Sequence, residues 1–378
     1  MKNIFFWSPH IDPQVATVKS VTNSLKSLIK FKKNLNLSLI NVFGEWDLLN
    51  LRDIKKIDLI PNKKNLHKKK FKGFLNSRIL YLKIFFYSYF PLKKILKKDK
   101  PEFLIIHLIT VVPILLYIFN KFETKLILRI SGLPRLNFIR FFLWKLVSKK
   151  IEFIICPTVE TKNFLIEKKI FDPKKVIFIP DPIIDINQIN TLRREVIKNK
   201  FKEPYFLCVG RLTKQKNHLF LINFFSKNPH YLDNSKLIII GDGELKNEYY
   251  KLIRHSQLEE KIKILSYKNN VLNYISNAKC VISCSLWEDP GFIMIESATV
   301  GTPIITSNCP NGPKEFIGKN ENGFLFNSNN ENSFKDTLDS FINSSKETIK
   351  QKLINAKKRT KIYTCFHNSK KLSKILNL

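Results

Sequence analysis

The stretch YFLCVGRLTKQKNHLFLINFF, residues 205–225, contains the structural unit that decides the fold. Its first six residues are almost entirely apolar, as in a strand that is buried on both faces of a sheet. A basic loop follows, and after it comes an apolar pattern with helical spacing. A buried strand, a loop and a helix in this order indicate a parallel α/β sheet covered by helices.

The same unit recurs along the chain. In the first half, β-rich runs precede helical sequence at residues 3–7, 37–43, 103–108, 125–131, 153–157 and 176–185. In the second half, 205–210 is followed by similar runs at 236–243, 261–266, 280–285 and 303–308. A polar stretch separates the two series, and 378 residues are long for one core. We therefore expect two Rossmann-like domains with parallel sheets facing a central cleft, over 1–187 and 188–355, and a C-terminal helix over 356–378 that packs back towards the first domain.

Cysteine usage and hydropathy exclude several classes of protein. The six cysteines are scattered along the chain, most of them in apolar runs and without a CxxC pair, which predicts neither a disulfide framework nor a metal site. The first residues are too short and too interrupted for a signal peptide. The most membrane-like run spans 103–119, but it has only 17 residues and contains His107, Thr110 and Pro113. We expect a buried strand and helix there, with no transmembrane helix.

The net charge of +34 favours anionic partners. Residues 62–100 hold 13 basic residues against one acid, interleaved with Phe, Leu, Ile and Tyr. This segment is typical of an amphipathic element lying on an anionic membrane surface, and equally of a helix hairpin with a basic outer face. The chain shows no RNP, KH, helix-turn-helix or zinc-finger pattern, so we expect no specific nucleic acid partner. A basic nucleic-acid-binding protein nevertheless stays an alternative, which the salt dependence of binding would test.

Ligands of open parallel sheets bind beyond the carboxyl ends of the strands. After strand 205–210, Arg211 and Lys216 lie beside the start of a helix, where two cations and free amides form a cradle for a diphosphate. After strand 236–240, Gly241-Asp242-Gly243 allows a tight turn or close approach of the backbone to a ligand. The third glycine of a dinucleotide fingerprint is missing, which argues against NAD.

The segment WEDPGFIMIESATVG, residues 287–301, reads as a capped helix that carries two acids. Asp289 is expected to be the N-cap, Pro290 the first helical residue and Gly301 the helix end. Glu288 then lies in the loop after a strand, and Glu296 lies inside an apolar helix. A buried acid needs a partner, and the two hydroxyls of a ribose would supply donors.

Five motifs in one order carry a family resemblance across residues 203–327: GRLxxxKN, GDGE, two glutamates separated by seven residues, GTPIITSNCPNGPKEFI and NGFLF. They resemble the family 4 retaining glycosyltransferases, which have the GT-B fold. The resemblance implies a metal-independent, hexosyltransferase-type enzyme without a cofactor, which uses a UDP- or GDP-sugar as co-substrate. The acceptor would be a glycan, lipid-linked or part of a lipopolysaccharide or surface-polysaccharide precursor. The enzyme would be cytoplasmic and peripheral at the inner face of the plasma membrane, with a sugar-nucleotide epimerase of the same fold as the alternative.

The resemblance also implies roles for individual residues. The catalytic residues would be Arg211, Lys216, Glu288 and His107. The donor would be bound by Gly210, Gly241, Asp242, Gly243, Tyr267, Gly291, Phe292, Ile293 and Glu296. The acceptor side would include His10, Arg129 and Ser131. Two positions depart from the family pattern, because Pro290 replaces the usual phenylalanine and the loop 8–17 lacks the usual glycine pair.

Overall fold

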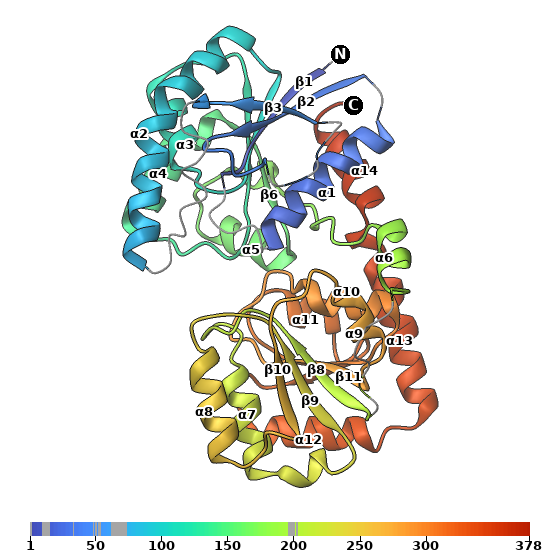
Figure 1. Cartoon of the computed structure of the whole chain (residues 1–378). Helices are drawn as coiled ribbons and strands as arrows, with labels where there is room; N and C mark the ends of the chain where they lie inside the picture. The colour runs from blue at the N-terminus through green and yellow to red at the C-terminus, as the bar shows by residue number, and fades with distance from the viewer. Residues whose placement is uncertain are drawn as a thin grey trace. The chain divides into compact units, whose positions relative to one another are not determined.

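The chain folds into two compact units, each described here by itself (Figure 1). The computed structural model describes every residue except 1, 10–15, 33, 48, 50, 52–53, 62–73, 196–200 and 202, and it describes residues 74–77 without their side chains. The first unit comprises Met1–Pro182 and Cys365–Leu378, and the second comprises Ile183–Thr364.

The first unit contains a parallel sheet of seven strands in the order β3-β2-β1-β4-β5-β6-β7. The strands are β1 (Lys2–Trp7), β2 (Leu35–Asn41), β3 (Lys55–Asp58), β4 (Phe103–Ile106), β5 (Lys125–Arg129), β6 (Ile151–Cys156) and β7 (Val176–Phe178). Side chains alternate between the two faces, so Phe5 and Trp7 enter one core while Ile4 and Phe6 enter the other. Both faces are apolar because helices cover both.

Four helices share the core on one face of this sheet: α2 (Phe74–Asp99), α3 (Val111–Phe119), α4 (Phe138–Val147) and α5 (Val159–Glu167). The other face is covered by α1 (Ala16–Phe31) and α14 (Cys365–Ile375). Short 3-10 turns are η2 (Ser148–Lys150) and η3 (Pro173–Lys175). The run 103–119 forms buried β4 and largely buried α3, as predicted. Among the described residues, no helix has the length and apolarity needed to cross a membrane.

The second unit contains a parallel sheet of six strands in the order β10-β9-β8-β11-β12-β13. The strands are β8 (Tyr205–Val209), β9 (Lys236–Ile240), β10 (Ile262–Leu265), β11 (Cys280–Ser283), β12 (Ile304–Ser307) and β13 (Phe324–Phe326). One face is covered by α7 (His218–Lys227), α8 (Lys246–His255) and α12 (Glu331–Ile342). The other is covered by α6 (Ile186–Leu192), α9 (Leu272–Ser276), α10 (Phe292–Val300), α11 (Gly312–Ile317) and α13 (Lys346–Thr360). The 3-10 turns are η4 (Pro229–Leu232) and η5 (Lys361–Tyr363).

Residues 356–378 contain the end of α13, the turn η5 and the separate helix α14. Helix α14 belongs to the first unit, where it packs on α1. The amide of Asn368 in α14 donates to the carbonyl oxygen of Pro180 over 2.9 Å, and the hydroxyl of Ser24 in α1 donates to the Asn368 side-chain oxygen over 3.2 Å. These bonds hold α14 in the first unit, although it is the last helix of the chain.

Candidate functional site

The strand order of the second sheet defines where a ligand can bind. Successive strands β8, β9 and β10 run outward on one side, whereas β11, β12 and β13 run outward on the other. The loops after β8 and β11 therefore leave the carboxyl edge of the sheet in opposite directions, and parallel sheets bind their ligands at such a place. The space between these two loops is called the crevice below. Lys216 lies in the first of these loops and Glu288 in the second.

Lys216 and Glu288 form an ion pair across this crevice, 72 residues apart in sequence. The Glu288 side chain is 8% exposed and that of Lys216 is 19% exposed, so the pair is largely withdrawn from water. The hydroxyl of Ser285 donates a second hydrogen bond to the same carboxylate oxygen over 2.6 Å. The carboxylate is thereby fixed by a cation and a hydroxyl at the edge of the sheet.

Arg211 borders the pair and is exposed. Its guanidinium donates to the side-chain oxygen of Gln215 over 3.3 Å. Gln215 in turn joins the two loops. Its side-chain amide donates to the backbone carbonyl of Trp287 over 3.0 Å, and its backbone carbonyl accepts from the backbone amide of Leu286 over 2.8 Å. The structure thus gathers the three predicted residues Arg211, Lys216 and Glu288 in one place.

The two glycines of the GDG motif are required by close packing of backbone on backbone. A Cβ at Gly241 would lie 1.9 Å from the Gly210 carbonyl oxygen, and one at Gly243 would lie 2.2 Å from the Leu212 carbonyl oxygen. Distances below 3.0 Å force the backbone to move. The loop after β9 can therefore lie against the loop after β8 only with glycine at both positions.

Asp242, between these glycines, organises the outer part of the crevice. One carboxylate oxygen accepts from the Lys246 ammonium over 2.7 Å, and the other accepts from the Tyr267 backbone amide over 2.8 Å. The hydrogen bond from Lys246 holds the pKa of Asp242 below its usual value. Tyr267 itself is 43% exposed, and its backbone is held at the end of β10 by this acid.

The helix after Glu288 starts later than the sequence suggested, so the prediction of Asp289 as N-cap and Pro290 as first helical residue is wrong. Helix α10 begins at Phe292, and Gly291 is its N-cap with φ +94°. A left-handed glycine cannot lie inside the helix, so the first turn begins after it. The first-turn amides of Phe292 and Ile293 therefore point out of the helix start without acceptors in the helix itself. The predicted helix end at Gly301 is confirmed by its left-handed C-cap conformation.

Glu296 lies in the second turn of α10 and is only 7% exposed. The predicted burial of this acid in an apolar helix is thus correct. Its proposed contact with a ribose stays a prediction.

His218 is a buried group that the sequence reasoning missed. It opens α7 two residues after Lys216 and is 1% exposed. Burial lowers the pKa of this imidazole to about 4, so it is neutral near pH 7. Within the described part of the chain, its Nδ1 atom has no hydrogen-bond partner. The sequence signal that could have identified His218 as a site residue is its position directly after the GRLxxxKN motif.

The first unit holds a separate polar cluster at the carboxyl edge of its own sheet. The register of β1, β4 and β5 places Ser8, His107 and Arg129 side by side, and Ser131 follows β5. Arg129 forms a buried ion pair with Asp181. In the described chain, hydrogen-bond partners are missing for the Ser8 hydroxyl, both His107 ring nitrogens, one Arg129 terminal nitrogen and the Ser131 hydroxyl.

This cluster offers several buried donors. Burial and the nearby Arg129 charge lower the pKa of His107 well below its usual value, so the imidazole is neutral. The predicted residues His107, Arg129 and Ser131 therefore lie together in the first unit. The third predicted acceptor-side residue, His10, falls outside the described residues.

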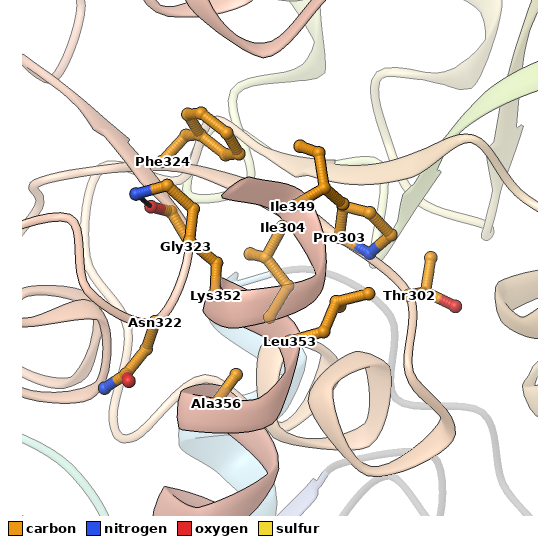
Figure 2. Close-up of a pocket in the computed structure, with 10 residues that line it drawn as sticks. All are labelled: Thr302, Pro303, Ile304, Asn322, Gly323, Phe324, Ile349, Lys352, Leu353 and Ala356. Atoms are coloured by element: carbon orange, nitrogen blue, oxygen red, sulfur yellow. Dashed lines mark hydrogen bonds between the residues drawn. The ribbon is translucent and has the colours of Figure 1, made fainter. Parts of the chain in front are cut away.

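The second unit also contains a small pocket, whose lining residues Figure 2 shows. Thr302 and Pro303 lead into β12, and Gly323 leads into β13, so the pocket is at the amino ends of these strands. Lys352 donates to the Gly323 carbonyl over 3.2 Å and lies 4.7 Å from the centroid of the Phe324 ring. The remaining lining residues are Ile304, Asn322, Ile349, Leu353 and Ala356. Because ligands of such sheets bind at carboxyl ends, this pocket is distinct from the crevice at Glu288.

No three His, Cys, Asp or Glu side chains in the described ranges come together as a metal site would require. The residues gathered at the carboxyl edge of the second sheet are two basic side chains, a buried carboxylate and helix amides.

Comparison with known proteins finds similarity to glycosyltransferases over part of the chain. The family model "Glycosyl transferases group 1" matches residues 190–360. An uncharacterized glycosyltransferase of Methanocaldococcus jannaschii is 30% identical over 249 residues, covering 60% of this chain and 61% of that protein. The UDP-Gal:alpha-D-GlcNAc-diphosphoundecaprenol alpha-1,3-galactosyltransferase of Escherichia coli is 29% identical over 241 residues, covering 60% of this chain and 59% of its own length. The chain thus spans about three fifths of the length of these curated relatives.

The fold has solved counterparts over its whole length. HepE of Anabaena, crystallised in complex with UDP, matches 100% of both chains with a TM-score of 0.74 at 14% identity. Two parallel-sheet α/β domains with such counterparts confirm the predicted GT-B architecture. The central cleft between the two domains stays a prediction. The match to the group 1 glycosyltransferases therefore rests on residues 190–360, the part of the chain that contains the Lys216–Glu288 pair.

Proposed function

We propose that this protein is a retaining glycosyltransferase that moves a hexosyl group from a UDP- or GDP-sugar to a glycan acceptor. The observation that carries the proposal is the Lys216–Glu288 pair, with Arg211 beside it, at the switch point of the six-stranded sheet. Further support comes from a solved counterpart that was crystallised with UDP and from the similar Escherichia coli protein, which is named as a UDP-Gal-dependent galactosyltransferase.

The charges in the crevice suit departure of a nucleotide. As the bond between the anomeric carbon and the β-phosphate oxygen breaks, its electron pair stays on the phosphate oxygen. Arg211 and Lys216 would stabilise this growing negative charge, and preorganised cations lower the barrier because they need not reorganise during the step. We propose that these fixed cations replace a metal ion, so that a chelator leaves turnover unchanged.

The neutral and acidic groups would hold the rest of the donor. Glu288 accepts hydrogen bonds from the hydroxyls of the transferred sugar, near the first-turn amides after Gly291. Glu296 accepts from the ribose hydroxyls, and the backbone around Tyr267 faces the base. Gly241 and Gly243 allow the loops after β8 and β9 to pack closely, and Gly210 leaves room for the Lys216 side chain.

The polar cluster of the first unit would serve the acceptor side. Its neutral His107 and the unpaired donors of Arg129 and Ser131 suit hydroxyl or phosphate oxygens. The acceptor hydroxyl would attack the anomeric carbon on the face from which the nucleotide leaves, which retains the configuration. Its proton would pass to the departing phosphate oxygen.

We propose a lipid-linked or surface-polysaccharide precursor as acceptor, because the name of the Escherichia coli relative contains diphosphoundecaprenol. The basic segment 62–100 would bring the protein to the anionic inner face of the plasma membrane as a peripheral enzyme. Residues 62–73 of this segment lie outside the described residues, whereas residues 74–99 form α2.

Release of nucleoside diphosphate from a set of sugar nucleotides tests the proposal. Glu296→Ala and Lys216→Ala should abolish release while circular dichroism shows a folded protein. The matched control is Lys227→Ala, whose exposed ion pair with Glu331 lies at the far end of α7. Undiminished release in both site variants would refute the assigned roles, and an epimerised free sugar nucleotide without transfer would favour the epimerase.

A further inference from the structure

The outer face of α2 is apolar although it is exposed. Four side chains form a stripe with helical spacing, and their exposed fractions are 47% for Ile79, 58% for Leu82, 70% for Phe86 and 72% for Phe90. The opposite face of the same helix enters the core through Leu80, Ile84, Leu92 and Leu96. The helix is thus apolar on the side that packs and also on the side that does not.

Helix α4 has the same property. Its exposed fractions are 83% for Phe138, 67% for Ile139, 53% for Phe142 and 49% for Leu146. The rings of Phe138 and Phe142 stack on each other with centroids 6.4 Å apart. The core is reached by Trp144 and Val147 instead.

These two faces belong to one layer of helices. Helix α3 packs against both α2 and α4, and all three helices share the core on the same face of the seven-stranded sheet (Figure 1). Phe119, at the end of α3, is 73% exposed. Single exposed apolar side chains are ordinary, but a grouping of this size on a soluble protein marks a binding surface.

The charges along these two helices are basic, apart from Asp99 at the end of α2. Between residues 78 and 98, and again between 131 and 151, the sequence contains basic residues and no acid. They are Arg78, Lys83, Lys93, Lys94, Lys97 and Lys98 in the first range, and Arg135, Arg140, Lys145, Lys149 and Lys150 in the second. The spacing of four residues continues the apolar stripe from Phe90 to the exposed Lys94 and Lys98. Aromatic and aliphatic side chains with lysines at their border match the interface of an anionic bilayer, where apolar groups enter the acyl region and cations meet headgroups.

We propose that the outer face of α2 and α4, defined by Ile79, Leu82, Phe86, Phe90, Phe138, Ile139, Phe142 and Leu146, is a membrane-docking surface for anionic bilayers. We call it the α2–α4 surface. The proposal rests in part on the peripheral location proposed above. It assigns most of the apolar contact with the bilayer to described residues of α2 and α4, which lie outside the basic stretch 62–73. The contact needs no sugar substrate, so it can fail or succeed independently of the transfer reaction.

Vesicle sedimentation with the full chain tests this surface. The probes are vesicles of phosphatidylcholine alone and vesicles that also contain phosphatidylglycerol. Phe90→Ser/Phe138→Ser should lower partition into the anionic vesicles roughly tenfold or more, because two largely exposed rings no longer enter the bilayer. Lys94→Glu/Lys98→Glu should weaken binding to anionic vesicles at low salt and should abolish the preference over neutral vesicles.

The matched control is Phe366→Ser. Phe366 is 59% exposed, but it lies on α14, which covers the other face of the sheet. This variant should bind vesicles as the wild type does, and all variants should keep the wild-type circular dichroism because the altered side chains are exposed.

Three outcomes would overturn the proposal. The wild-type protein could fail to sediment with anionic vesicles, or Phe90→Ser/Phe138→Ser could bind as tightly as wild type. The same variant could also convert a dimer into a monomer by light scattering without changing vesicle binding, which would assign the α2–α4 surface to a second copy of the chain.

Discussion

Replacing Lys216 by methionine separates the structural role of this lysine from its electrostatic role. The methionine preserves most of the side-chain volume, but it leaves the Glu288 carboxylate, 8% exposed, without its cation. Removing one partner of a fully buried pair costs about 3–5 kcal/mol. Here the Ser285 hydroxyl still donates over 2.6 Å, and Lys216 is 19% exposed, so part of that cost is relieved. We expect a loss of about 2 kcal/mol, which lowers Tm by about 4–8 °C in a unit of this size.

The double variant Lys216→Met/Glu288→Gln then distinguishes the two roles. It removes both charges and leaves a side-chain oxygen for the Ser285 hydroxyl, so its Tm should return close to that of the wild type. Release of nucleoside diphosphate should remain at least about 100-fold below wild type in the single and the double variant, because the cation that faces the phosphate is gone. Thermal unfolding and a coupled assay of released nucleotide measure the two properties. A double variant that regains turnover together with stability would refute the electrostatic role.

Three further predictions concern other parts of the second unit. Gly241→Ala should destabilise the second unit by about 2–4 kcal/mol, because the new Cβ would lie 1.9 Å from a carbonyl oxygen. Gly301→Ala has open space around its Cβ and should cost only about 1 kcal/mol, for its left-handed backbone. Thermal unfolding of the two variants compares these free energies. Burial lowers the pKa of His218 from 6.5 to about 4, so the unfolded chain binds a proton in this window that the folded chain does not. Stability should therefore fall as pH drops from 6.5 to 4, and His218→Gln should flatten that part of a Tm–pH profile. Asp242→Asn should raise KM for the sugar nucleotide with little change in kcat, and it should cost less than about 1 kcal/mol because the ion pair is exposed.

The architecture was predictable because it follows from local patterns. Buried parallel strands are continuous apolar runs, and alternating strand and helix signals define a doubly covered sheet. The residues at strand ends, Arg211, Lys216 and Glu288, could be selected by the same reasoning, because ligands gather at carboxyl edges. The sequence pattern therefore indicated the edge of the sheet at which the crevice lies.

The contacts within the site were not predictable, because they join distant parts of the chain. The partner of Lys216 is 72 residues away, and the bridge through Gln215 depends on how two loops meet. Whether His218 is buried or exposed depends on the helix that packs over it and not on its neighbours in sequence. The start of α10 was misplaced for the same reason, since Asp289-Pro290 has the local signature of a helix start while tertiary contacts decide otherwise.

Those contacts also explain how the chain accommodates proline at position 290. The Glu288 amide donates to the Pro310 carbonyl over 3.0 Å, and the Gly312 amide donates to the Glu288 carbonyl over 3.3 Å. A Cβ at Gly312 would lie 1.8 Å from the Pro290 carbonyl oxygen, so the two loops are in direct contact. Neither hydrogen bond uses an amide at position 290, and proline therefore costs the junction no donor. The backbone on either side of Pro290 holds Glu288 against Lys216, and this placement of the carboxylate depends on Gly312 more than on the side chain at 290.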